Sequence, residues 1–171
     1  TMSDLAELYR ENDGKVSTFI DFEYFQRPDG LPALEETYNF KIADSHLKTG
    51  APGASVNALE NKQTDVGMVF ATDSSIAEND WVVLQDNKRF YPPYDLTPVV
   101  RSEVLDEYPE IKDALNELVA TFPGGGKDWT PKYMMESQRA WSALNGMVDI
   151  EKMDADEAAR EYLMEHDMVE E

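Results

Sequence analysis

Aromatic rings beside a rigid turn are the first side chains in this sequence that could bind a small molecule. Residues 88–98, KRFYPPYDLTP, place Phe90, Tyr91 and Tyr94 around a pair of prolines. Because proline fixes its own backbone, Tyr94 would lose little entropy on contacting a ligand. A structural crossover between two layers is the alternative interpretation of this turn, and both interpretations can hold at once.

Two further candidates follow apolar runs that are typical of buried strands. Arg27 comes after VSTFIDFEYF at 16–25, and Phe70 lies near the end of DVGMVFAT at 65–72. Open α/β sheets bind ligands at the carboxyl ends of their strands, and a planar guanidinium suits a carboxylate. The alternatives are a surface Arg27 paired with Asp29 or Glu23. For Phe70, the alternative is a place in the core.

One arginine and several rings together predict a site for a zwitterion with a quaternary ammonium. Such a cation has no N–H to donate, so it is held by the electron-rich faces of rings, each contact contributing about 0.5–2 kcal/mol when desolvated. Arg27 would hold the opposite, carboxylate end. We therefore expect Arg27, Phe70 and Tyr94 to line one open face.

Motifs for other chemistry are missing from the sequence. His46 and His166 lie far apart without metal-ligand spacing, and the chain has no cysteine. There is no phosphate-binding glycine loop and no nucleophile elbow, since the glycines at 124–126 follow a predicted helix instead of preceding one. We predict no catalytic residue, no metal site and no cofactor.

The charge of the chain excludes one class of partner. Its 171 residues carry 15 basic and 35 acidic side chains, a net charge of −20. Such a field repels phosphate backbones, so nucleic acid is not an expected partner. The acid is spread along the whole chain, which favours a surface adapted to high salt, as in halophilic organisms. An acidic protein from ordinary conditions is the alternative.

The order of elements predicts an α/β layer with a mostly parallel sheet, followed by helices alone from residue 102 onward. A helix capped by Ser3 opens the chain, and Asp154 opens the last helix. No run of 18 apolar residues is present, so no membrane span is expected. Strands are expected at 16–25, 40–42, 65–72, 81–84 and 98–101, and later helices at 31–38, 55–61, 73–77, 102–107, 109–122 and 131–147.

Three ordered segments carry a resemblance to a known family. They are FEYFQRPDGLPALEETYNF at 22–40, ALENKQTDVGMVFATD at 58–73 and VVLQDNKRFYPPYDLTPVVR at 82–101. They resemble the E-F-x-x-R-x-D-G, A-L-x-x-G-x-x-D-V and V-L-x-D-x-K-x-F-F-P-P-Y segments of the substrate-binding components of osmoprotectant ABC importers. That family captures glycine betaine, choline, carnitine and related compounds.

The resemblance implies a fold and roles for the three candidate residues. Residues 1–95 would form the second lobe of a type II periplasmic-binding-protein-like fold. Residues 96–171 would be the hinge return and the C-terminal helices of an incomplete first lobe, with 119–152 as a longer insertion than the family implies. Arg27 would be the carboxylate clamp, Phe70 would replace a cage tyrosine, and Tyr94 would be a cage tyrosine beside the hinge.

The resemblance also implies a function without catalysis. The chain would be a fragment of an extracytoplasmic solute-binding protein that delivers its ligand to ABC permease subunits. It would be membrane-associated through a lipid anchor or a permease that is not present in this chain. Two alternatives remain at this point: an enzyme that processes a small amine, and a helical interaction module of residues 102–171 that self-associates through an exposed helical face.

Overall fold

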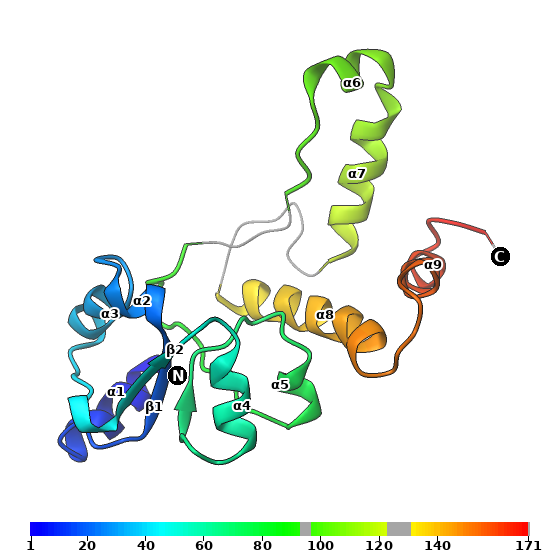
Figure 1. Cartoon of the computed structure of the whole chain (residues 1–171). Coiled ribbons are helices and arrows are strands. Elements are labelled where there is room, and N and C mark those ends of the chain that lie inside the picture. The colour runs from blue at the N-terminus through cyan, green and yellow to red at the C-terminus, as the bar shows by residue number, and fades with distance from the viewer. Residues whose placement is uncertain (93–96, 123–130, 171) are drawn as a thin grey trace. The chain divides into compact units, whose positions relative to one another are not determined.

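The computed structural model describes residues 1–92, 97–122 and 131–170. Backbone contacts divide the chain into two compact units, Thr1–Pro92 and Pro93–Glu171 (Figure 1). Within the described residues, all strands belong to the first unit, and the second unit is helical.

The first unit is built on a three-stranded parallel sheet. The central strand β1 (Thr18–Asp21) lies between β2 (Leu47–Gly50) and β3 (Val66–Gly67). Asp21 pairs with Gly50, and Phe19 with Gly67, so all three strands end at the same edge. The predicted α/β class with a parallel sheet is confirmed.

Short helices surround this sheet, and local signals explain where they begin and end. Thr1 caps α1 through a capping box with Asp4, so the prediction of Ser3 as the cap was wrong. Asn39 ends α3 in the left-handed conformation, with φ 55°. The helices of this unit are α1 (Met2–Glu11), α2 (Phe22–Gln26), α3 (Leu31–Tyr38), α4 (Ala54–Glu60) and α5 (Ser75–Glu78), with one 3-10 turn at Asp44–His46.

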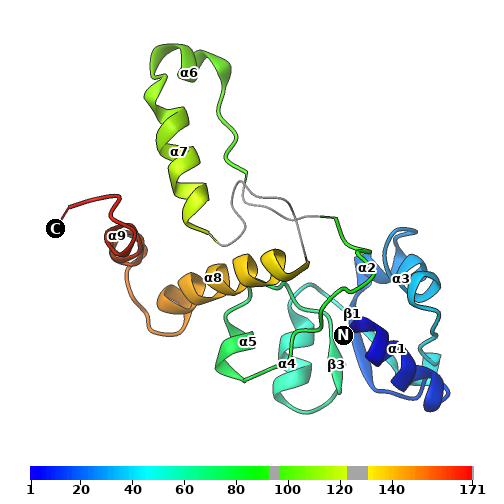
Figure 2. The same ribbon diagram turned by 180° about the vertical axis from the view of Figure 1, so that it is seen from behind.

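The helices form two groups in the first unit. Viewed from the front and from behind, α1 and α3 lie at one end of the unit, and α4 and α5 lie at the other (Figure 2). The core between α1, α3 and β1 is aromatic: the rings of Tyr9 and Phe40 stack with centroids 4.9 Å apart. The hydroxyl of Tyr9 lies 2.6 Å from that of Thr18, which gives the buried phenol a partner.

The strand expected at 40–42 is absent because its amides already have acceptors. The N–H of Phe40 donates to the carbonyl of Glu35 at 3.0 Å, and the N–H of Ile42 donates to the side-chain Oε1 of Glu35 at 3.0 Å. The N–H of Ala43 donates to the carbonyl of Gly14. The segment is therefore bound to the end of α3 and to the turn after α1, not to a neighbouring strand.

The other strand predictions were wrong in length or place. The run at 16–25 is a strand only as far as Asp21, whose carboxylate accepts the N–H of Glu23 and starts α2. The strand at 65–72 is reduced to β3, and residues 81–84 and 98–101 form no strand. β2 was not predicted.

The second unit contains α6 (Ser102–Glu107), α7 (Glu110–Thr121), α8 (Pro131–Asp149) and α9 (Ala155–Glu165), as the sequence predicted. Phe122 is buried, and its ring stacks on Trp141 at 4.1 Å and on Tyr162 at 5.1 Å. This stack joins the end of α7 to α8 and α9. The glycines at 124–126 lie outside the described residues. No helix that the structure describes is long and apolar enough to cross a membrane.

Candidate ligand-binding site

The carboxyl ends of the three parallel strands gather around a small pocket in the first unit. Asp21 ends β1, residues 51–53 follow β2, and residues 68–70 follow β3. This is the edge at which open α/β sheets bind ligands. The cavity measures about 20 Å³, room for about one water. Its lining residues are Asp21, Ala51, Pro52, Gly53, Ser55, Val56, Met68, Val69, Phe70 and Asp73.

Phe70 is an exposed ring at this pocket. Its side chain lies on the pocket wall, yet the residue is 65% exposed. A core phenylalanine would be nearly sealed, so the alternative of a core residue was wrong. An exposed aromatic face beside a cavity costs free energy in water, and it gains a partner only when something covers it.

Two carboxylates give the pocket a negative wall. Asp21 Oδ1 accepts the N–H groups of Glu23 at 2.7 Å and Tyr24 at 3.3 Å, and thereby caps α2. Asp73 Oδ1 accepts the N–H and the hydroxyl of Ser75 at 3.1 and 2.7 Å. The lining residues include no lysine or arginine. The local field therefore favours a cation beside the Phe70 ring.

Arg27 lies at the end of α2 and forms a two-pronged ion pair. Its Nε donates to Asp29 Oδ1 at 3.0 Å, and its Nη2 donates to Asp29 Oδ2 at 2.6 Å. These hydrogen bonds hold the pKa of the Asp29 carboxyl below its usual value. The pairing with Asp29, one of the two alternatives from the sequence, is thus present. Because the pair holds the guanidinium in one orientation, it is also compatible with a role as a clamp.

Of the two predicted site residues that the structure describes, one lines the pocket and the other does not. Phe70 lines the pocket, whereas Arg27 is exposed and is not among the lining residues. Tyr94 lies outside the described residues. The two rings just before it pack on the core instead: Phe90 meets Tyr91 edge-on at 5.0 Å, and both contact the buried cluster of the first unit.

Asp21 and Asp73 line the pocket, although neither was among the predicted site residues. Both do cap a helix or turn, and both also face the cavity. Asp21 is the last residue of β1, and Asp73 directly follows the apolar run at 65–72. Their position at the end of an apolar run is the signal that could have found them. No cluster of three or more potential metal ligands occurs among the residues described.

Comparison with known proteins identifies the family of the chain. The family described as "Substrate binding domain of ABC-type glycine betaine transport system" (OpuAC) matches residues 1–165. A glycine-betaine-binding protein of Pseudomonas aeruginosa is 28% identical, covering 99% of this chain and 52% of its own length. The carnitine transport binding protein OpuCC of Listeria monocytogenes is 31% identical over 69% of this chain and 37% of its own length.

A solved structure shows the same fold over about half of its length. It is titled as a glycine betaine/carnitine/choline ABC transporter, is 27% identical, and superposes with a TM-score of 0.74 over 98% of this chain and 54% of that one. The chain thus spans about half the length of the glycine-betaine-binding relative and of this structure. The family consists of binding proteins, not enzymes. On the match over residues 1–165, the chain belongs to the substrate-binding domains of ABC-type glycine betaine transport systems.

Proposed function

We propose that this chain is part of the solute-binding component of an ABC importer, and that it captures glycine betaine or a related quaternary-amine osmolyte. The observation that carries the proposal is the exposed Phe70 ring on a negatively charged pocket at the carboxyl edge of the sheet. A quaternary ammonium is attracted by a ring face and by nearby carboxylates. It has no N–H group, so it needs no hydrogen-bond acceptor.

The size of the pocket indicates that this chain supplies one wall of the site. Small-molecule sites measure several hundred Å³, whereas this cavity holds about 20 Å³. In the proposal, residues 1–95 are the second lobe and residues 96–171 are the return helices of the first lobe. Closing the first lobe over Phe70 would cover the ring and complete the aromatic cage, with Tyr94 contributed beside the hinge.

In the proposed complex, the ring and the arginine bind opposite ends of the ligand. Phe70 contacts the methylated nitrogen, and Arg27 holds the carboxylate of a zwitterionic ligand. The pair with Asp29 orients the guanidinium, at 2.6 and 3.0 Å, before a ligand arrives. No chemistry is done on the ligand.

The partner and the location follow from the same proposal. The loaded protein would dock on ABC permease subunits outside the cytoplasm, held near the membrane by a lipid anchor or by the permease itself. Self-association through the helical segment is a second proposed contact, because α7 carries an apolar stripe that is only half-buried in the described structure, at Ile111, Leu115 and Leu118.

Calorimetry on the two-lobed protein tests the function. Glycine betaine, choline and carnitine are titrated into the wild type and into Phe70→Ala and Tyr94→Ala. We expect at least one ligand to bind, and each variant to weaken it. Phe25→Ala is the matched control, because Phe25 is also an exposed ring of the first unit and does not line the pocket. Unchanged affinity for every ligand in both site variants would show that the site is assigned wrongly.

A further inference from the structure

Phe70 and Asp73 lie at the two ends of one tight turn in the pocket wall. The N–H of Asp73 donates to the carbonyl of Phe70 at 2.9 Å, which is the hydrogen bond that closes a four-residue turn. Such a turn brings the Cα atoms of its first and last residues to within about 7 Å of each other. Because both residues line the pocket, the turn places a carboxylate close to the exposed ring.

Asp21 lies on the strand beside the segment that carries the ring. It is the last residue of β1, and two residues earlier the carbonyl of Phe19 accepts the N–H of Met68 at 3.0 Å. The chain that leads from Met68 to Phe70 therefore runs next to the end of β1. The hydroxyl of Ser55 in α4 donates to the carbonyl of Met68, so this chain is also held by a helix.

Hydrogen bonds fix the positions of both carboxylates. Oδ1 of Asp21 accepts two N–H groups at the start of α2, and Oδ1 of Asp73 accepts the N–H and the hydroxyl of Ser75. Both aspartates are half-buried, and no basic side chain is among the lining residues of the pocket. A charge that is held by the fold and partly shielded from water acts on a neighbouring ion more strongly than an exposed one. Both charges therefore act on a ligand that covers the Phe70 ring.

We infer that Asp21 and Asp73 determine the charge specificity of the site, which favours a trimethylammonium group over an uncharged tert-butyl group of the same shape. The inference rests on the proposed function, in which Phe70 contacts a quaternary nitrogen. A ring face makes apolar contact with either group and adds a moderate attraction for the cation. Two fixed carboxylates attract only the cation. The aspartates thus act against a neutral molecule that the ring alone would accept.

Asparagine at each position removes the charge and keeps the cap. Its amide oxygen accepts the same N–H groups, and asparagine and aspartate are equally good residues at a helix start. Calorimetry on the two-lobed protein compares the wild type with Asp21→Asn, Asp73→Asn and the double variant. The ligands are choline and its carbon analogue, 3,3-dimethylbutan-1-ol, which has no positive charge to attract a carboxylate or a ring face.

The ratio of the two affinities measures charge specificity. We expect the wild type to bind choline at least about tenfold more tightly than the alcohol, because the ring and the carboxylates both favour the cation. Each single variant should weaken choline about threefold and the double variant about tenfold, while the alcohol stays within about twofold. A loss of folding would weaken both ligands and leave the ratio unchanged. An unchanged ratio in the double variant would overturn the inference.

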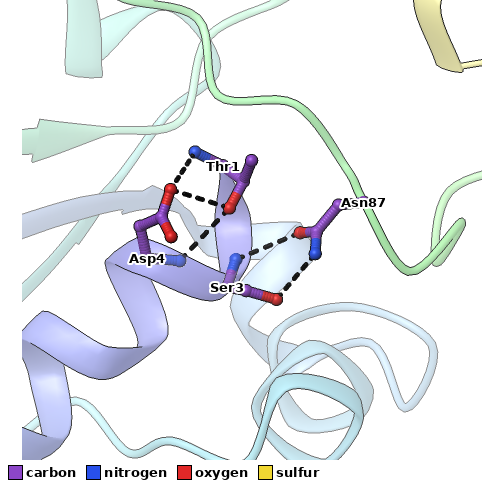
Figure 3. A network of polar contacts seen from close by, with 4 residues as sticks. All are labelled: Thr1, Ser3, Asp4 and Asn87. Carbon is purple, nitrogen blue, oxygen red and sulfur yellow. Dashed lines mark hydrogen bonds and ion pairs between the residues drawn. The ribbon is translucent and has the colours of Figure 1, made fainter.

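Asp4→Asn is the matched control for the loss of one negative charge. Asp4 also lies at the start of a helix of the first unit, where its carboxylate accepts the hydroxyl of Thr1 at 2.9 Å (Figure 3). It is exposed and does not line the pocket. This variant should leave the ratio of affinities unchanged. A fall in the ratio as large as in Asp21→Asn would assign the effect to the overall charge of the protein and refute the inference.

The salt dependence of the wild type tests the inference if the variants fold poorly. Raising KCl from about 0.1 to 1 M shortens the screening length from about 10 to 3 Å, so choline should bind several-fold more weakly and the alcohol should not. A choline affinity that does not fall would contradict a role for the carboxylates. A wild type that binds neither choline nor glycine betaine refutes the proposed function, and the inference with it. Choline binding that Phe70→Ala weakens and the double variant does not refutes the inference alone.

Discussion

Replacing Arg27 should weaken the binding of a ligand that has a carboxylate more than the binding of a ligand that has none. A hydrogen bond to a charged group contributes about 1.5–3 kcal/mol, and a factor of ten in affinity is about 1.4 kcal/mol. The Arg27 side chain is 49% exposed, so we take the lower part of that range. Arg27→Ala should weaken glycine betaine about tenfold. Choline has no carboxylate, so its affinity should stay within about twofold, and calorimetry with both ligands measures the difference.

The thermal stability of Arg27→Ala shows whether a loss of affinity reflects a loss of folding. The pair of Arg27 with Asp29 is exposed on both sides, 49% and 71%, and exposed pairs contribute about 0–1 kcal/mol. The thermal midpoint should therefore hardly move. Arg27→Lys keeps the charge but loses the planar pair of N–H donors. Its affinity for glycine betaine should therefore lie between those of the wild type and Arg27→Ala. Arg10→Lys is the matched control, because Arg10 donates to backbone carbonyls of residues 38 and 39. Equal weakening of both ligands, or of neither, would refute the assignment.

Three further perturbations test the fold around the site. Glu35→Ala should lower the free energy of unfolding by about 1–3 kcal/mol, because the buried N–H of Ile42 loses its acceptor; chemical denaturation measures this, and an unchanged midpoint would contradict it. Burial raises the pKa of Tyr9 from 10.0 to about 12. The neutral phenol thus contributes its full stabilisation below pH 10, and this contribution is lost as the pH rises from 10 toward 12. The thermal midpoint should therefore fall between pH 10 and 12 but not between pH 8 and 9. Because the net charge is −20, raising KCl from about 0.1 to 1 M should raise the thermal midpoint through screening; a midpoint that falls would argue against adaptation to high salt.

Helices were predictable from the sequence because their signals are local. Asn39 ends α3 and Asp154 caps α9, and each needs only a neighbour a few residues away. The alternation of helices and apolar runs also predicted the parallel sheet. Thr1 was missed as the cap of α1 because Ser3 is an equally good capping residue two positions later.

Strands were less predictable because a strand needs a partner that is distant in sequence. Phe40 and Ile42 have the residue types of a strand, yet their amides bind Glu35. β2 is a strand without the residue types of one, since only Leu47 of its residues LKTG is strongly apolar. It lies at the edge of the sheet, so its outer side needs no core contact. Its pairing with β1 is visible only in three dimensions.

For the site, residue type and position in the sequence left two interpretations open. An aromatic residue ending an apolar run fits the core or a ligand site equally well, and only the 65% exposure of Phe70 separates the two. Arg27 presents the reverse case, since its pairing with Asp29 is a local R-x-D contact that spacing could predict.

The two carboxylates that line the pocket also stabilise the fold. Asp21 starts α2 and Asp73 holds the turn into α5, so neither carboxylate could be replaced by an apolar residue without loss of a cap. Because both also line the cavity, the requirement for caps leaves negative charge beside Phe70. A carboxylate group would be repelled from this wall, whereas an ammonium gains from the ring and from both acids. A zwitterion bound here would therefore turn its cationic end toward Phe70 and its anionic end away from the pocket, which is the orientation that the proposed role of Arg27 requires.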